Sequence, residues 1–271
     1  MQIEPMPGLE PDQAEVHARL CDLVLDAPRA DEAYDAIPES RSARIISVDI
    51  ARYLIPEFRD RLFRIRHTPS TATPAGAYAH NRMLRTLTRG TTTPDGVVVF
   101  LAGGAGSGKT TSLASTADVV ELAFDNQMLN PDRARVLLDA AADNGWQGVV
   151  TYVHRPFPLV VDGVIRRSVE TGRWNRLHEL PAMHMRAQQT FWELSSEYRT
   201  NPAVSWGVLE NLGTPSSPTD VRPLSPLALR PGEPRRYQDV QSLRKVVDEQ
   251  VRLAIQEGRF PEPLRTLCLG A

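Results

Sequence analysis

Residues 103–110 combine glycines, a lysine and a threonine at a spacing that suits phosphate binding. They read Gly-Gly-Ala-Gly-Ser-Gly-Lys-Thr and fit the pattern G-x-x-x-x-G-K-[ST] in full. Glycines let a loop curl until its backbone N–H groups point inward at phosphate oxygens. Lys109 can then reach the outer phosphates of a nucleotide, and the Thr110 hydroxyl can help to hold Mg²⁺. The expected phosphate contacts are Gly103, Gly104, Ala105, Gly106, Ser107, Gly108, Lys109, Thr110 and Thr111.

The lysine of this motif is unusual within the chain. Of the 31 basic residues, only Lys109 and Lys245 are lysines, which a codon bias towards arginine explains without any functional meaning. The planar fork of arginine is too wide for a point contact between two phosphates. Phosphate geometry therefore gives a reason for lysine at position 109. No such reason applies to Lys245.

Asp125 is the carboxylate expected nearest this motif. It ends the segment Ala117–Phe124 (ADVVELAF), which predicts a strand, and ligands of open α/β folds bind at the carboxyl ends of strands. A carboxylate there can hold Mg²⁺ through water or take a proton from a hydroxyl group. The alternative is that Asp125 only begins a turn before Asn126. Asp118, which begins the same run, is expected at the far edge of the sheet.

Strands and helices alternate around the motif, and this order predicts the fold class. Continuous apolar runs are typical of strands buried on both faces, while Asn130-Pro131 begins a helix with an N-cap and a proline in the first turn. The expected strands are Val97–Leu101, Ala117–Phe124, Gln147–His154 and Ala203–Leu209, and the expected helices are 132–143, 158–171, 181–198 and 237–257. This alternation predicts an α/β fold of the P-loop NTPase type, with a parallel sheet and helices on both faces.

Four segments are expected along the chain. Residues 1–94 form a helical N-terminal region, in which 68–74 (TPSTATP) is typical of a turn-rich linker. Residues 95–212 hold the motif and the alternating strands, and 213–235 form a linker with six prolines. The last segment, 236–271, contains an amphipathic helix.

The overall composition limits the classes of protein. The chain has 271 residues, 41% of them hydrophobic, and a formal net charge of −2. These values are typical of a globular protein and leave no basic excess for binding nucleic acid. No run approaches the ~18 apolar residues of a membrane span, and the opening MQIEPM lacks a secretory signal pattern. Cys21 and Cys268 lie near opposite ends, which disfavours a disulfide framework, so we expect a cytoplasmic protein.

Arginines gather in the second half of the expected core. Enzymes that transfer phosphoryl groups close positive charges over them, commonly from a mobile lid, and Gly172-Arg173 at a helix end suits such a lid. The alternative is a solvated helix face, because glutamates interleave with the arginines. The arginines are Arg155, Arg166, Arg167, Arg173, Arg176, Arg186 and Arg199, and the glutamates are Glu170, Glu179, Glu193 and Glu197.

Together these motifs resemble the zeta-toxin-type P-loop kinases. The residues that carry the resemblance are 103–111 (GGAGSGKTT), VVELAFDNQML, Asn130-Pro131, VVTYVHRP, Arg166-Arg167, 170–173 (ETGR) and His184. They lie within about residues 95–212, less than half of the chain. In zeta toxins a longer helix and then a further strand follow the phosphate loop. Here only about eight residues separate Thr110 from Asp118, so that strand is missing or merged with the next one.

The resemblance implies transfer of the γ-phosphate of ATP, with Mg²⁺, to a hydroxyl of a small metabolite. The acceptor is a UDP-N-acetyl sugar in zeta toxins and a nicotinamide dinucleotide in related bacterial effectors. The resemblance also implies an antitoxin or immunity protein as partner, and action in the cytoplasm, including that of a target or host cell. The implied catalytic residues are Lys109, Asp125, Arg166 and Arg173; the acceptor side has Asp125, Asn126, Arg155 and His184; Asn211 lies near the adenine, and Thr110 serves Mg²⁺.

Two other functions remain open at this point. A polynucleotide 5′-kinase would share the phosphate loop, but the balanced charge and the lack of an aromatic and basic track count against it. A nucleotide-dependent interaction protein would bind ATP without transferring its phosphate, and the long flanking segments favour that alternative. The chain lacks the Asn-Lys-x-Asp element of guanine recognition, which disfavours a GTPase.

Overall fold

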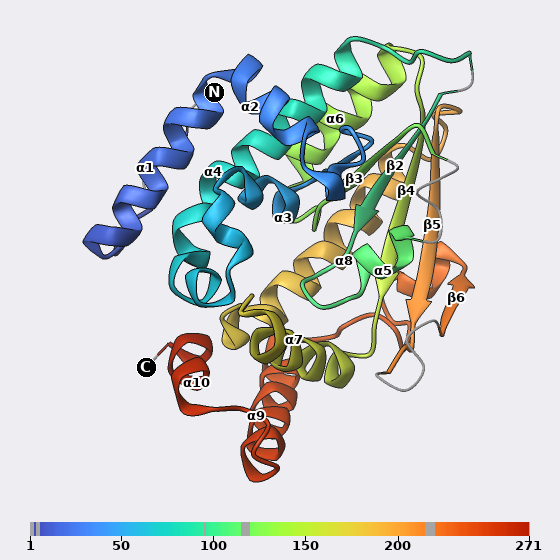
Figure 1. The fold of residues 1–271 in the computed structure, drawn as a ribbon. Helices are drawn as coiled ribbons and strands as arrows, with labels where there is room; N and C mark the ends of the chain where they lie inside the picture. The colour runs from blue at the N-terminus through green and yellow to red at the C-terminus, as the bar shows by residue number, and fades with distance from the viewer. Residues whose placement is uncertain (1–2, 4–5, 95, 115–119, 215–219, 271) are drawn as a thin grey trace.

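A six-stranded, mostly parallel sheet organises the chain (Figure 1). The structure is a computed structural model that describes residues 3, 6–94, 96–114, 120–214 and 220–270. The strands, in spatial order, are β1 Ile45–Ser47, β3 Leu122–Asp125, β2 Val97–Ala102, β4 Gln147–His154, β5 Val204–Asn211 and β6 Val221–Leu224. All neighbours are parallel except β5 and β6. The predicted α/β class is therefore confirmed.

The order of the strands creates a crevice at the end of β2. The chain passes from β2 to β3 on one side, and then crosses to β4 on the other side of β2. Ligands of open α/β sheets bind at such a reversal, outside the carboxyl ends of the strands. The segment 103–110 leaves β2 at this point. Residues 115–119, which include Asp118 and part of the predicted strand 117–124, lie outside the described residues.

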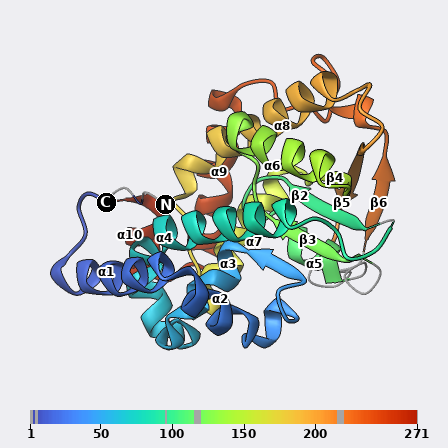
Figure 2. The same ribbon diagram turned by 90° about the horizontal axis from the view of Figure 1, so that it is seen from above.

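The two faces of the sheet are covered differently. One face packs against α4, α6 and α8 in the largest apolar cluster, which includes Val98, Phe100, Phe124 and Tyr152. These helices are α4 Arg61–Thr88, α6 Pro131–Asp143 and α8 Leu180–Glu197. On the other face, a smaller cluster contains Val99, Leu101 and Ala123, and Figure 2 shows the short helix α5, Lys109–Ala114, on that side. No helix in the described part of the chain is long and apolar enough to cross a membrane.

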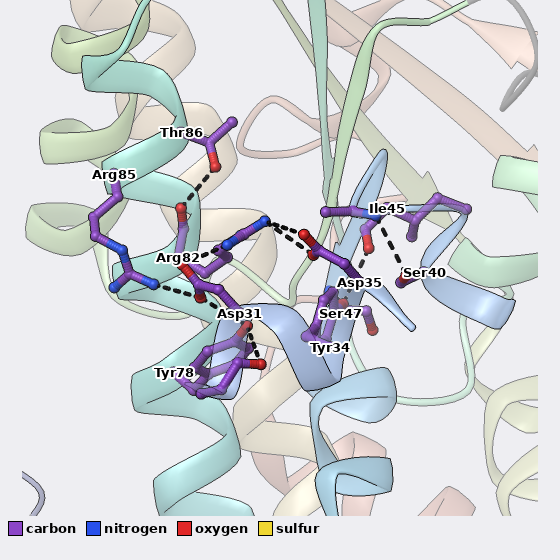
Figure 3. Close-up of polar contacts among 12 residues, drawn as sticks. Asp31, Tyr34, Asp35, Ser40, Ile45, Ser47, Tyr78, Arg82, Arg85 and Thr86 are labelled. Atoms are coloured by element: carbon purple, nitrogen blue, oxygen red, sulfur yellow. Dashed lines mark hydrogen bonds and ion pairs between the residues drawn. The ribbon is translucent and has the colours of Figure 1, made fainter. Parts of the chain in front are cut away.

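The N-terminal region contributes a strand that the sequence did not predict. Ile45–Ser47 forms β1 at the edge of the sheet, in register with Ala123–Asp125 of β3. The Tyr34 hydroxyl, from helix α2 (Ala27–Asp35), donates to the Ile45 carbonyl at 3.0 Å and accepts from the Ser47 N–H at 2.9 Å (Figure 3). The expected boundary at residue 94 therefore does not separate the sheet from the N-terminal region.

An ion-pair network holds α2 against α4 (Figure 3). Arg82 of α4 is buried and pairs with both Asp31 and Asp35 of α2. Asp31 also accepts hydrogen bonds from Tyr78 and Arg85. Buried charges that are paired in this way resist separation, because breaking one pair leaves its partner desolvated and unpaired. The network therefore fixes the element that presents Tyr34 to β1.

Helix α4 runs through the segment that was predicted to be a linker. A proline inside a helix leaves the carbonyl four residues earlier without its N–H partner, and both freed carbonyls of α4 have other donors. For Pro69 the carbonyl is that of Ile65, which accepts from Trp174 Nε1 at 2.9 Å. For Pro74 the carbonyl is that of Ser70, which lies 2.9 Å from His17 Nδ1 of helix α1, Pro11–Leu25. Long-range contacts thus override the local turn signal, and the linker prediction for 68–74 was wrong.

The C-terminal segment packs against the core through helix α7. Helices α7 (Phe157–Thr171), α9 (Val240–Gln256) and α10 (Glu262–Leu269) share a second apolar cluster. The expected linker 213–235 contains β6 and a 3₁₀ turn at Pro226–Leu229, so part of it is a strand of the sheet.

Candidate functional site

Glycines give the segment 103–110 a conformation that other residues rarely adopt. The φ angles of Gly103, Gly106 and Gly108 are 130°, 76° and 91°, in the region that favours glycine. A Cβ atom on Gly108 would lie 1.9 Å from Nδ2 of Asn211. The glycine-rich segment is therefore both locally twisted and closely approached by its neighbours.

Two predicted ligand contacts instead hold this segment in place. His184 of α8 is buried, and its Nε2 lies 2.8 Å from the Ala105 carbonyl, to which it donates as the Nε2–H tautomer. Asn211, at the end of β5, donates from Nδ2 to the Ser107 carbonyl at 2.9 Å. Neither side chain lines the cavity described below. His184 and Asn211 therefore hold the backbone of the glycine-rich segment, and their contacts with an acceptor and with adenine stay predictions.

Lys109, Thr110 and Asp125 come together as the sequence predicted. Lys109 Nζ donates to the carbonyls of Gly103 and Gly104 at 2.7 and 3.0 Å, and the Thr110 hydroxyl donates to Asp125 Oδ2 at 3.1 Å. Burial raises the pKa of Asp125, against the opposing charge of Lys109. Burial likewise lowers the pKa of Lys109, although Asp125 and Asp49 favour its charged form. Thr111 follows in α5.

A cavity of about 630 Å³ opens beside the glycine-rich segment. Its walls come from α3 (Val48–Ala51), α4, α5, α6, α7 and the residues that follow β3. Seven cationic side chains line it, against three carboxylates, although the whole chain has a net charge of −2. The cations are Arg52, Lys109, Arg133, Arg155, Arg166, Arg167 and Arg173, and the carboxylates are Asp49, Asp125 and Glu170. This excess suits a polyanionic ligand.

Four of the seven predicted arginines line the cavity, namely Arg155, Arg166, Arg167 and Arg173, whereas Arg176, Arg186 and Arg199 do not. Arg155 donates to the carbonyls of Gly106 and Gly213 at 3.0 and 2.8 Å. Arg166 forms a looser ion pair, with its Nη1 atom 3.8 Å from Oε1 of Glu170. Burial and the charge of Arg173 lower the pKa of Arg167 to about 10, which leaves it protonated at neutral pH. The Nε atoms of Arg52, Arg155, Arg166 and Arg167 are buried without a hydrogen-bond partner among the described residues. Such donors are costly unless a ligand or water satisfies them.

The proposed lid segment after α7 is anchored against α4. Gly172 ends α7 with φ 76°, and a Cβ atom there would lie 2.5 Å from the Arg61 carbonyl. Arg61 and Arg64 donate to the carbonyls of Val169 and Thr171, respectively. These contacts place Arg173 and its neighbours over the cavity.

Asp49 is the cavity carboxylate that sequence reasoning missed, and Arg52, Arg133 and His80 are further lining residues that it missed. Asp49 lies in the first turn of α3, directly after β1, and its carboxylate forms an ion pair with Arg173. The cavity walls around Asp49 displace part of its water, which alone would raise its pKa, but the charges of Arg173, Arg52 and Arg167 outweigh this effect and hold the pKa below its ordinary range. A three-residue edge strand is too short for a periodic pattern. The only sequence signal for Asp49 as a site residue is the apolar pair Ile45-Ile46 shortly before it.

The end of the cavity formed by α4, α6 and the residues after β3 has a different character. His80 and Gly76 of α4, Arg133 of α6 and the segment 126–130 line the cavity there. Burial and the charge of Arg133 lower the pKa of His80 to about 4, so His80 is neutral at pH 7. The Asn126 side chain lines the cavity and accepts from the N–H of Met128 at 3.1 Å. This end provides polar and apolar surface for a group that is less charged than a polyphosphate.

Two comparisons with known proteins find no relative of the chain. A scan against protein-family models and a search of the curated proteins both find no match for the chain. The functional argument therefore depends on the geometry of the cavity.

Proposed function

We propose that the chain is an ATP-dependent phosphotransferase that moves the γ-phosphoryl group to a hydroxyl of a small metabolite. The observation that carries the proposal is the cavity at the carboxyl end of β2, which is lined by Lys109, the Thr110–Asp125 pair and five arginines. Arg155, Arg166, Arg167 and Arg173 come from α7 and the residues that flank it, and Arg52 directly follows α3. This combination matches the needs of phosphoryl transfer, which depends on positioning and on stabilising charge. The sheet and the glycine-rich segment fit a P-loop NTPase type of fold, and we include that type in the proposal.

The residues present also fit a magnesium ion bound together with a nucleotide. Within the described residues, no group of three or more His, Cys, Asp or Glu side chains could hold a metal ion alone. Mg²⁺ in kinases is typically held by one or two protein oxygens, substrate phosphates and water. The Thr110 hydroxyl and the Asp125 carboxylate, 3.1 Å apart, supply such oxygens. When bound, the ion would neutralise charge on the β- and γ-phosphates.

The cationic side chains have separable tasks in this proposal. Lys109 sits in the bend of the glycine-rich segment, where a point charge can contact two phosphates. Arg166 and Arg173 approach from α7 and from the segment after it, and their charge would stabilise the negative charge that develops on the transferred group. The guanidinium groups of Arg52, Arg166 and Arg167 also line the cavity and can donate charge-assisted hydrogen bonds to phosphate oxygens.

The acceptor would occupy the end of the cavity between α4, α6 and the segment 126–130. The resemblance to zeta-toxin-type kinases supports a nucleotide sugar or a dinucleotide as the acceptor, in the cytoplasm, with an antitoxin or immunity protein as partner. Asn126 and Arg155 line the cavity and support this part of the proposal.

A Lys109→Met variant tests the proposed function. Wild-type protein incubated with ATP, Mg²⁺ and a metabolite extract is expected to give a product heavier by one phosphate in mass spectrometry. Lys109→Met is expected to lose this product at least ~100-fold, while the control Lys245→Met, which changes the chain's other lysine on α9, retains it. Undiminished product from Lys109→Met would contradict the proposal. Tight ATP binding by wild type without any phosphorylated product would favour a nucleotide-dependent interaction protein.

A further inference from the structure

Two carboxylates follow neighbouring strands and face the same cavity. Ser47 of β1 is in register with Asp125 of β3. Asp49 comes two residues after Ser47, whose hydroxyl accepts from the Asp49 N–H at 3.2 Å. Both carboxylates line the cavity. Asp49 and Asp125 are far apart in the sequence, but the pairing of β1 with β3 brings them to the same part of the fold.

Asp125 is engaged on the side of the glycine-rich segment. It accepts from the Thr110 hydroxyl, it is only 8% exposed, and Lys109 is the opposite charge that acts on it most strongly. These contacts leave Asp125 suited to support Thr110 and a metal ion. They do not favour a role in which Asp125 meets a separate acceptor molecule.

Asp49 is placed differently. Its side chain is 41% exposed and lines the cavity, so a bound molecule can reach it. Three arginines surround it, namely Arg173, Arg52 and Arg167, and they keep it ionised. The backbone before it is fixed because Tyr34 holds the outer edge of β1. An ionised, accessible and positioned carboxylate can orient a hydroxyl group and take its proton.

This inference rests on the proposed function. We propose that Asp49 is the catalytic residue that accepts the proton of the acceptor hydroxyl, while Asp125 serves Thr110 and the metal ion. The hydroxyl oxygen forms a bond to the γ-phosphorus of ATP, the bond from that phosphorus to the β–γ bridging oxygen breaks, and ADP leaves with the electron pair. The proton passes from the hydroxyl to a carboxylate oxygen of Asp49 and then to water.

The ion pair with Arg173 is compatible with this step. Arg173 lines the same cavity as Lys109, so a bound γ-phosphate would share its charge with Asp49. Sharing the guanidinium weakens the charge that stabilises the ionised carboxylate, which makes Asp49 a better proton acceptor. Phosphoryl transfer also has a loose transition state that demands orientation of the hydroxyl more than a strong base.

The test compares Asp49→Asn with Asp125→Asn in the metabolite-phosphorylation assay, with ATP affinity measured separately. General-base removal typically costs 10²–10⁴-fold, so we expect Asp49→Asn to lower kcat by at least ~100-fold while ATP affinity stays within about threefold. Asp125→Asn is expected to raise the Mg²⁺ concentration needed for half-maximal rate. Asp248→Asn, on the exposed side of α9, is the control for the substitution itself. Asp49→Ala with added formate is expected to regain part of the rate, which a merely structural role would not allow.

The outcomes separate this inference from the proposed function. An active wild type together with Asp49→Asn and Asp49→Ala variants that keep more than a tenth of its kcat would overturn the role of Asp49 alone. Loss of ATP affinity or of folding in Asp49→Asn, with no formate rescue of Asp49→Ala, would also overturn it and assign Asp49 a structural role. A wild type that phosphorylates nothing in the extract would overturn the proposed function and this inference together.

Discussion

Removal of a single hydroxyl group, that of Tyr34, is expected to destabilise the fold measurably. In Tyr34→Phe the ring remains, but the Ile45 carbonyl loses its donor at 3.0 Å and the Ser47 N–H loses its acceptor at 2.9 Å. Tyr34 is fully buried, so water cannot readily replace the hydroxyl. Each net hydrogen bond contributes about 1 kcal/mol, and leaving a buried partner unsatisfied costs 1–3 kcal/mol. We expect a loss of about 2 kcal/mol in the free energy of unfolding, which lowers the ratio of folded to unfolded protein about 30-fold.

Urea unfolding measures this change directly. The midpoint should fall in Tyr34→Phe while the slope m stays constant, which indicates a change in stability alone. Tyr53→Phe is the matched control, because the Tyr53 hydroxyl makes no hydrogen bond to the residues that the structure describes. A loss below about 0.5 kcal/mol in Tyr34→Phe, or an equal loss in both variants, would refute the idea that Tyr34 holds the outer edge of β1.

Two further predictions concern helix α4 and the buried His184. In Trp174→Phe the Ile65 carbonyl, which Pro69 leaves without a backbone donor, loses its bond from Trp174, so urea unfolding should show a loss of about 1–3 kcal/mol; an unchanged midpoint would contradict this. Burial lowers the pKa of His184 to about 4, below the 6.5 of an exposed histidine, so the unfolded chain binds the proton more readily. Stability should be full above pH 6.5 and fall as the pH drops towards 4, by about 2 kcal/mol at pH 5 for this group. The decline should be shallower in His184→Gln, and an equal slope in both proteins would contradict the assignment.

The parts of the fold that the sequence predicted are those encoded locally. Val97–Leu101 is a continuous apolar run, and Gln147–His154 is rich in β-branched and aromatic residues; they form β2 and β4 almost without change of bounds. The glycine-rich segment also lies where the pattern placed it, because it is a single strand-to-helix connection. Asp125 lies at the end of β3, which pairs with β2 and so brings its carboxylate to Thr110. The two strands and the glycine-rich segment need no knowledge of the rest of the chain.

The parts that sequence reasoning missed depend on distant residues. Helix α4 continues past Pro69 and Pro74, and Trp174 and His17 supply the missing donors from outside the helix. No local pattern contains that information. The resemblance to zeta-toxin-type kinases implied ligand contacts for His184 and Asn211, but it gave no sign that both side chains bond backbone carbonyls of the glycine-rich segment.

The same dependence on distant residues explains why the N-terminal region cannot be an independent addition to the core. It fills the edge of the sheet beside β3 with β1, it brings Asp49 and Arg52 into the cavity, and its α4 carries part of the largest apolar cluster. A chain that begins at residue 95 would keep Lys109, Thr110 and Asp125 but would expose the apolar face of the sheet that α4 covers, and the edge of β3 that β1 covers. Exposed edges and apolar faces promote association between chains. The site therefore requires segments from both sides of the glycine-rich motif, and its charge balance is set as much by residues before the motif as by those after it.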